Sequence, residues 1–254
     1  LSVVFTLVYG LEGSVFALSL SLLFNCVINN VSLRKALKKY PKQYKLKRMY
    51  IKEILSFSFP IALQESSYSI IQWSLTYILI KLSSYGELGI YNAAIQWSAI
   101  IAFLPGVLQN VMLSYFCESV DDTTKHKKLV NTMLMFNVCI TVIPFLLIFA
   151  FSEFICSFYG KTFIDMKNVL NIVVFSAIIS AVINVFNNEF ISIGKTWFLF
   201  ITRLIRDLLL ITIAYACIAS FKNISAAMIL AIVSLTMYIL YCIFLALMYY
   251  KHKQ

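Results

Sequence analysis

The chain has 254 residues, of which 61% are hydrophobic and only 13% are charged. Its mean hydropathy of +0.86 is far above the values of soluble domains. A soluble protein of this length needs polar residues over much of its surface, and this chain has too few of them. The composition therefore excludes a soluble globular domain and predicts an all-α, polytopic transmembrane helical bundle.

The formal net charge of +10 would suit a nucleic-acid-binding protein, but its distribution indicates otherwise. Nine lysines and arginines and no acidic residue occur in one segment, RKALKKYPKQYKLKRMYIK (residues 34–52). Basic residues next to a span mark the cytoplasmic side of a membrane. We therefore expect a basic cytoplasmic linker at 32–54, contact with membrane lipids and no nucleic-acid partner. The alternative is an amphipathic surface helix with Leu33, Leu37 and Tyr40 on its apolar side.

Apolar runs of spanning length follow one another along the chain. Residues 1–9 are expected to end a span that starts before the given sequence, because the first residue lies inside an apolar run and is not Met. A tight turn is predicted at 10–13 and the first complete span at 11–30. Six further spans are predicted at 55–82, 89–115, 129–151, 166–193, 198–219 and 226–249.

The loops between these spans alternate in charge. Starting from a cytoplasmic linker, the loops 117–128 and 194–196 and the tail fall inside, and they carry most of the remaining lysines. The loops 83–87, 152–165 and 221–223 fall outside. The alternation supports the predicted orientation more strongly than any single span does.

Metal and cofactor chemistry has no support in the sequence. The six cysteines occur singly, without a C-x-x-C motif, and the two histidines, His126 and His252, are not at ligand spacing. We interpret the thiols as small apolar residues and predict no metal site and no cofactor.

Several polar side chains lie inside the second predicted span, just beyond Pro60. Glu65, Tyr68 and Gln72 are spaced i, i+3 and i+7 and so share one helix face, and Gln64 precedes them. Glu65 is roughly 15 Å into the span by the helical rise. Its carboxyl group is predicted either to hydrogen-bond a neighbouring helix or to line a substrate or proton path.

Two other spans carry rows of small polar side chains. Asn92 and Gln96 form an i, i+4 amide pair in one of them. A longer row lies in 166–193 and comprises Ser176, Ser180, Asn184, Asn187 and Asn188. Such a row is typical both of a packing seam between helices and of a polar path.

The sharpest functional signal is Arg203, Arg206 and Asp207, which follow Trp197 in the next span. Arg203 and Asp207 are spaced i, i+4 and are expected to pair, whereas Arg206 has no obvious partner on its own helix. A guanidinium group is a planar fork suited to phosphate, so Arg206 in particular is predicted to bind an anion. The alternative is that both arginines extend to the lipid headgroups.

One stretch, residues 57–108, resembles the polysaccharide-transport flippases (Wzx-type, O-antigen) of the multidrug/oligosaccharidyl-lipid/polysaccharide exporter superfamily. The likeness lies in FPIAL (residues 59–63), GELGIYNAAIQW (residues 86–97) and Pro105, with GKTWF (residues 194–198) farther on. The resemblance implies two six-helix lobes around a central cavity, of which this chain is the C-terminal part. Residues 1–31 would end the first lobe, 32–54 link the lobes, 55–250 form the second lobe and 251–254 form a cytoplasmic tail.

The resemblance also implies an activity, which is not enzymatic. Such transporters move undecaprenyl-pyrophosphate-linked sugar units across the bacterial inner membrane by alternating access. Other polysaccharide-assembly proteins are possible partners. The side chains of suitable type for pyrophosphate and sugar are Arg203, Arg206, Gln64, Glu65, Tyr68, Gln72, Asn92 and Gln96. If Glu65 is desolvated, it is also a possible proton carrier.

Three alternatives remain open from the sequence. A drug or cation exporter of the same superfamily should have a more acidic cavity than two deep arginines allow. A polytopic glycan polymerase or ligase should have a large outer loop with histidine or arginine, which 152–165 lacks. The third is an inactive remnant of a transporter.

Overall fold

The computed structural model is helical through nearly all of the residues it describes, which are 2–38, 48–160, 163 and 166–252. The helices within them are α1 (Ser2–Leu37), α2 (Arg48–Leu82), α3 (Tyr85–Ser119), α4 (Thr123–Ala150), α5 (Ser152–Phe158), α6 (Met166–Ser192), α7 (Thr196–Ser220) and α8 (Ala226–His252). The described ranges contain no strand. The predicted all-α class is therefore confirmed.

The chain divides into two compact units, and the first comprises Leu1–Ile51 with α1. Gly10 interrupts α1 with φ 60° and ψ −139°, a conformation that glycine adopts without a steric penalty. A Cβ on Gly13 would lie 2.2 Å from the carbonyl oxygen of Phe5, so only glycine lets the two arms of α1 approach this closely. The turn expected at 10–13 is thus found at Gly10.

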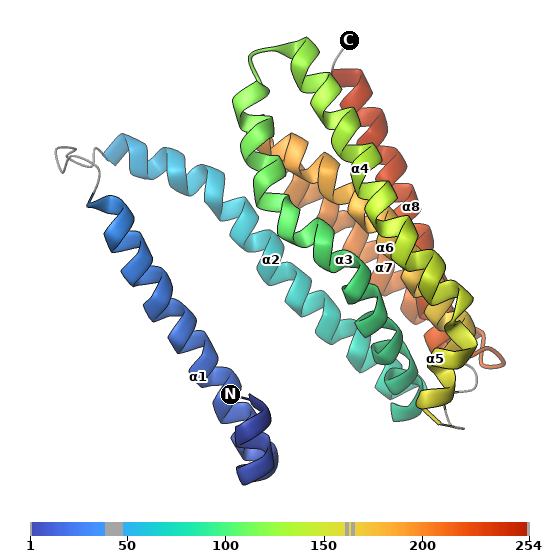
Figure 1. Cartoon of the computed structure of the whole chain (residues 1–254). Helices are drawn as coiled ribbons and strands as arrows, with labels where there is room; N and C mark the ends of the chain where they lie inside the picture. Colours follow the sequence, from blue (N-terminus) through green and yellow to red (C-terminus); the bar gives the residue numbers. More distant parts are fainter. Residues whose placement is uncertain (1, 39–47, 161–162, 164–165, 253–254) are drawn as a thin grey trace. The chain divides into compact units, whose positions relative to one another are not determined.

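The second unit comprises Lys52–Gln254 and is built around α6. Of the most apolar stretch of α6, 61% is buried, against 17% for α4. Figure 1 shows α3, α4 and α8 running alongside α6. The buried apolar side chains form two clusters, one around Leu79, Val174 and Leu230 and the other around Phe116, Phe190 and Leu245. Both clusters include residues of α6, which is why this helix holds the unit together.

Successive long helices of this unit run in opposite directions (Figure 1), so their connections fall alternately at two ends. At one end, a carboxylate oxygen of Glu87 accepts hydrogen bonds from the Ser225 hydroxyl and the Ala227 amide, and Glu87 thereby caps α8. The other end carries more of the described lysines, namely Lys125, Lys127, Lys128, Lys195 and Lys251. The predicted alternation of connections is confirmed.

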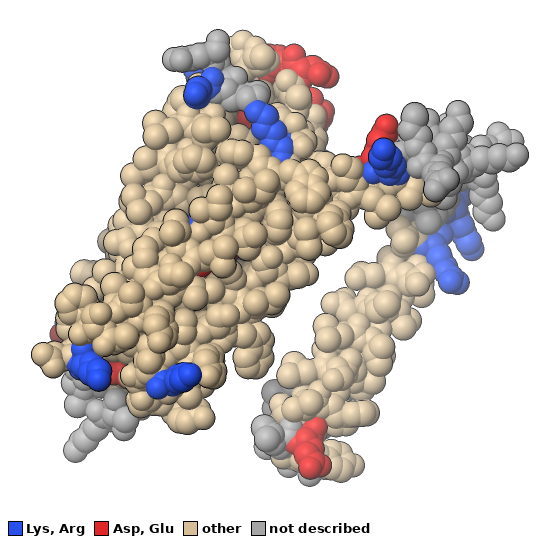
Figure 2. All heavy atoms as spheres, turned by 180° about the vertical axis from the view of Figure 1, so that it is seen from behind, with Lys and Arg blue, Asp and Glu red and all other residues tan. Residues whose placement is uncertain are grey.

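The surface of the second unit is that of a membrane protein. Figure 2 shows lysines, arginines and acidic residues gathered near its ends, with a nearly uncharged band between them. Exposed large apolar side chains are numerous and include Trp73, Phe103 and Leu247. A contiguous apolar surface of this size is not compatible with water.

Five of the described helical segments are long and apolar enough to span a membrane, rather than the seven spans expected. They are Glu12–Lys35, Tyr85–Ser119, Thr123–Ala150, Met166–Ser192 and Ala226–Lys251. The other two long helices, α2 with 35 residues and α7 with 25, have sufficient length but contain charged residues within their apolar sequence. The prediction of a polytopic bundle therefore holds, with a smaller number of fully apolar spans.

Helix bounds also differ from the expected spans. α2 begins at Arg48 and α4 at Thr123, earlier than predicted, because a helix continues past the apolar part that hydropathy detects. The expected outer loop at 152–165 contains a short helix, α5. In the basic segment, Leu33 and Leu37 continue α1, while residues 39–47, including Tyr40, lie outside the described part of the chain.

Candidate functional site

The arginines of α7 lie well inside the helix. Arg203 is about 10 Å and Arg206 about 15 Å from the start of α7 at the helical rise of 1.5 Å per residue. Their side chains are 19% and 11% exposed, and that of Asp207 is 5% exposed. The structure therefore encloses both guanidinium groups in the bundle. The alternative prediction, that both arginine side chains extend to the lipid headgroups, does not match the structure.

Arg206, which was expected to lack a partner on its own helix, is the more tightly paired of the two arginines. Its Nη2 and Nε donate to Oδ1 of Asp207 at 2.5 and 2.8 Å. The expectation failed because it considered only i, i+4 spacing, whereas the long arginine side chain reaches the carboxylate of the adjacent residue. The guanidinium carbon also lies 4.8 Å from the ring centroid of Tyr241 and 5.2 Å from that of Tyr238, both on α8.

Arg203 is held more loosely. Its Nε is 4.0 Å from Oδ2 of Asp207, so the expected i, i+4 pair exists at the limit of ion-pair distance. Its Nη1 is 3.7 Å from Oε1 of Glu65 on α2, and its guanidinium carbon lies 5.5 Å from the ring centroid of Tyr68. Of these contacts, only the Glu65 ion pair joins α7 to a carboxylate on another helix.

The polar face predicted on α2 is present and is turned toward Arg203. Glu65 and Tyr68 both contact Arg203, and the amide of Gln72 donates to the Tyr68 hydroxyl at 3.0 Å. The Glu65 side chain is 71% exposed, so it is reachable from outside the bundle. Its contact with α7 is an ion pair at 3.7 Å and not the predicted hydrogen bond, and the choice between its two predicted roles stays a prediction.

The remaining predicted residues lie apart from this group. Gln64 is buried at 7% exposure, whereas Asn92 and Gln96 are exposed on α3. Among the described residues, no hydrogen bond or ion pair joins these three side chains to the arginines. The structure therefore brings together five chemically suitable side chains: Glu65, Tyr68, Gln72, Arg203 and Arg206. We call this group, with Asp207, Tyr238 and Tyr241, the arginine cluster.

The row of small polar residues on α6 is largely enclosed. Ser176 and Asn188 are buried, and Ser180, Asn184 and Asn187 are partly buried. The Ser176 hydroxyl donates to the carbonyl of Val173 on its own helix. The burial of Ser176 and Asn188 fits a packing seam better than an open path.

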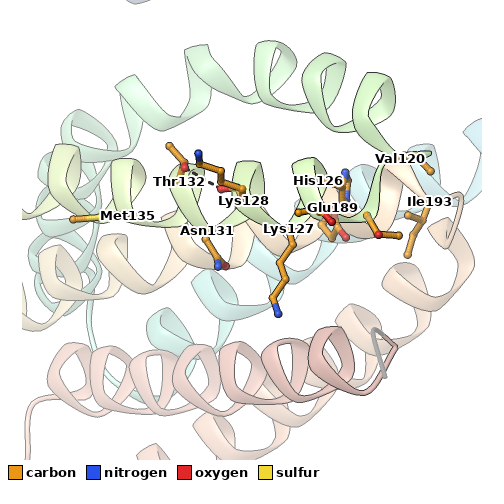
Figure 3. Close-up of a pocket in the computed structure, with 11 residues that line it drawn as sticks. Val120, His126, Lys127, Lys128, Asn131, Thr132, Met135, Glu189 and Ile193 are labelled. Carbon is orange, nitrogen blue, oxygen red and sulfur yellow. Dashed lines mark hydrogen bonds and ion pairs between the residues drawn. The ribbon is translucent and has the colours of Figure 1, made fainter.

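Sequence reasoning missed a second group of charges, between α4 and α6. Nε2 of His126 lies 2.5 Å from Oε2 of Glu189, and Nδ1 of His126 lies 2.8 Å from the Ser119 hydroxyl. The residues His126 and Glu189 are only 4% and 2% exposed (Figure 3). These partners are 63 residues apart, so no spacing rule could have found them; the one signal was an acidic residue inside an apolar helix.

Metal binding finds no support in the described part of the chain, which contains no group of three His, Cys, Asp or Glu side chains placed to hold an ion. The cysteines are free thiols there. Cys156 on α5 is buried, and this burial raises the pKa of its thiol. The charge of Lys167 acts in the opposite direction, but burial has the larger effect, so the thiol is not activated as a nucleophile.

These observations define a multi-pass helical membrane protein with an enclosed arginine cluster. Residues 1–107 match the model of a family described as polysaccharide biosynthesis protein. The matched residues include FPIAL and GELGIYNAAIQW, so two of the stretches on which the expected resemblance rests lie in the part that is similar to polysaccharide biosynthesis proteins; GKTWF lies beyond it. No curated protein matches the chain.

Proposed function

We propose that this chain is part of a transporter that moves lipid-linked oligosaccharide units across the bacterial inner membrane by alternating access. Three observations support the proposal: the family match, the polytopic bundle, and arginines enclosed at a depth where charge is expensive. The substrate would be an undecaprenyl-pyrophosphate-linked O-antigen or polysaccharide unit. The basic segment and the C-terminus would lie in the cytoplasm.

The observation that carries the proposal is the difference between the two arginines. Arg206 donates two short hydrogen bonds to Asp207 and lies between two tyrosine rings, so it is a fixed part of the bundle. Arg203 is held by long ion pairs at 3.7 and 4.0 Å, and one of these partners, Glu65, is mostly exposed. A pyrophosphate can therefore replace Glu65 on Arg203 without disturbing Asp207. In this scheme Arg203 binds the anion and Arg206 positions the carboxylate between them.

The sugar would be bound by amides and aromatic rings near Arg203. Tyr68 and Gln72 are hydrogen-bonded to each other on the face that Arg203 contacts, and they offer both donors and acceptors. Asn92 and Gln96 are exposed on α3 and are proposed as further contacts. Gln64 is buried, so its proposed contact requires a rearrangement of α2.

The test is a charge exchange between Glu65 and Arg203 in the full-length protein. Transport of a fluorescent lipid-linked oligosaccharide is measured in proteoliposomes for Arg203→Glu, Glu65→Arg and the double variant. If Arg203 binds the pyrophosphate in this environment, the exchanged pair will not restore transport, because the cation has moved to α2. We expect Arg203→Ala to lower transport by about 10- to 100-fold, a loss typical of one charge-assisted contact.

The matched control is Arg203→Lys, which keeps the charge but loses the planar fork. It should retain part of the activity that Arg203→Ala loses. Recovery of normal transport in the exchanged double variant would show that the pair is only structural and would end the proposal. The role of Glu65 as a proton carrier, which would couple transport to a proton gradient, stays a prediction.

One observation favours a second candidate, export of organic cations. The exposed carboxylate of Glu65 lies on the same face as the Tyr68 ring, and a carboxylate beside an aromatic ring suits a cation. Glu65→Gln distinguishes the two functions. Loss of the carboxylate should abolish cation binding, whereas it should leave Arg203 free and preserve or strengthen binding of the pyrophosphate.

A further inference from the structure

A large cavity lies at the end of the second unit opposite to the Glu87 cap. It is bounded by the first turns of α4 and by the ends of α3 and α6, and its volume is about 1020 Å³. Its lining includes His126, Lys127, Lys128, Asn131 and Glu189 (Figure 3). None of these residues belongs to the arginine cluster, so this is a separate place in the molecule.

The charge of the cavity is positive. Among the described residues that line it, Glu189 is the only carboxylate, whereas Lys127 and Lys128 contribute two positive charges. Among the described residues, neither Lys127 nor Lys128 has a carboxylate within ion-pair distance. Two lysines therefore line the cavity without a carboxylate partner, and their side chains leave α4 on different sides (Figure 3).

The start of α4 is not itself the source of this positive charge. Asp122 caps the helix, and its Oδ1 accepts from the amides of Thr124 and Lys125 at 3.1 and 3.0 Å. The N-terminal amides are thus already occupied. An anion in the cavity would be bound by side chains, and the donors available are the two lysines, Asn131 and the threonine hydroxyls.

Polar side chains occupy the middle of the lining, and Figure 3 shows Lys127 and Asn131 pointing to the same side of α4. Apolar side chains lie at its two ends: Met135 on α4 at one end, and Val120 and Ile193, just beyond α3 and α6, at the other (Figure 3). A wall that offers ammonium and amide donors next to aliphatic side chains suits an amphipathic ligand: an anionic head attached to a hydrocarbon chain.

The cavity lies at the depth of lipid headgroups. α4 has 28 residues and is therefore about 42 Å long, whereas a hydrocarbon core is about 30 Å thick. The first turns of α4, with Lys127 and Lys128, extend beyond the core into the headgroup region. Lysines there interact with anionic lipid, while Met135 is about two turns deeper, where acyl chains begin.

We propose that this cavity is a binding site for an anionic membrane phospholipid. Lys127 binds its phosphate, Asn131 donates to a headgroup oxygen, and Met135 contacts the start of an acyl chain, while Lys128 adds a second positive charge at headgroup level. This site does not depend on what the protein transports.

The experiment is native mass spectrometry of the full-length protein, released from mixed micelles that contain phosphatidylglycerol or phosphatidylcholine. The protein should retain phosphatidylglycerol in preference to phosphatidylcholine. The double variant K127Q/K128Q should bind phosphatidylglycerol at least about tenfold more weakly, because two headgroup-level lysines are removed. The matched control is K81Q/K222Q, which removes the same charge from exposed lysines at the other end of the unit.

Two further measurements separate a lipid site from a plain phosphate site. Met135→Asn should weaken retention of phosphatidylglycerol, since it makes the acyl-chain end of the cavity polar. Inorganic phosphate at the same concentration should not displace the lipid. Equal losses in K127Q/K128Q and K81Q/K222Q, unchanged retention in K127Q/K128Q, or displacement by inorganic phosphate would each overturn the proposal.

Discussion

The two groups of buried charges in the second unit solve the same physical problem differently. In the His126–Glu189 pair, one base meets one acid at 2.5 Å, and both are almost completely buried. In the arginine cluster, two arginines share Asp207, and the second carboxylate, Glu65, is mostly exposed. In the closed pair the two side chains occupy each other, whereas the open cluster has a cation that can change partners.

This difference indicates which group is suited to bind a ligand. Desolvation makes an incompletely paired charge expensive, so an enclosed arginine with long contacts is kept for a reason other than stability. The His126–Glu189 pair has short contacts and a third partner, Ser119, whose hydroxyl also lies 2.9 Å from the carbonyl of Tyr115. Four carboxylates of the second unit, Glu189, Asp207, Glu87 and Glu153, are increasingly exposed in this order. The loss of stability expected when the contacts of each are removed decreases in the same order.

The largest effect is expected for Glu189→Ala, which leaves His126 buried without its acid. Removal of one partner from a buried pair lowers the free energy of unfolding by about 3–5 kcal/mol. Thermal unfolding of the purified protein in detergent measures the loss. The control is the double variant H126L/E189L, in which both charges are replaced by apolar side chains. It should be less destabilised than Glu189→Ala; equal destabilisation would mean that the charge pair is not the cause.

A smaller effect is expected for Arg206→Ala. Asp207 would lose its two short hydrogen bonds but retain Arg203 at 4.0 Å, so the free energy of unfolding should fall by about 1.5–3 kcal/mol. Unfolding in detergent again provides the measurement, with Arg206→Lys as the control that preserves charge without the paired geometry. If Arg206→Ala were as stable as the unchanged protein, Arg206 would not be the structural member of the cluster.

A still smaller effect on stability is expected at Glu87. This residue lies on α3, is partly buried, and its carboxylate caps the start of α8. Glu87→Ala should lower the free energy of unfolding by about 1–2 kcal/mol, the usual effect of losing a helix cap. Glu87→Gln keeps an acceptor oxygen and should recover part of the loss. Hydrogen exchange of the Ala227 amide gives a local readout, and unchanged protection in Glu87→Ala would contradict the capping role.

Sequence patterns could predict what depends on neighbours along one helix. The helical bundle, the alternation of its connections and the shared face of Glu65, Tyr68 and Gln72 all follow from hydropathy and from periods of three and four residues. Contacts between distant segments could not be predicted in this way. The His126–Glu189 pair spans 63 residues and the Glu87 cap spans 138. Each depends on which helices pack together, and that is decided by the whole bundle.

The partner of Arg206 was missed for a different reason. Asp207 is adjacent in the sequence, and adjacent residues on a helix point about 100° apart, so a spacing rule rejects the pair. The arginine side chain is long enough to turn back to it, and the rings of Tyr238 and Tyr241 favour that position. Local patterns thus located the cluster but did not assign its pairs.

The smallest effect is expected at Glu153 on α5, which is 80% exposed and accepts a hydrogen bond from Lys167. This hydrogen bond and the lysine charge hold the pKa of the Glu153 carboxyl below its ordinary value of 4.5. A carboxyl with a lowered pKa in the folded state contributes stability above its unfolded pKa, and the contribution is lost as the pH falls through the folded pKa. Because water and salt screen this pair, Lys167→Gln should leave thermal unfolding at pH 7 unchanged within error.

The pKa of Glu153, followed by NMR, should rise toward 4.5 in the same variant. A clear loss of stability at pH 7 would mean that exposure alone does not rank these carboxylates, and the contrast between the closed pair and the open cluster would need another basis.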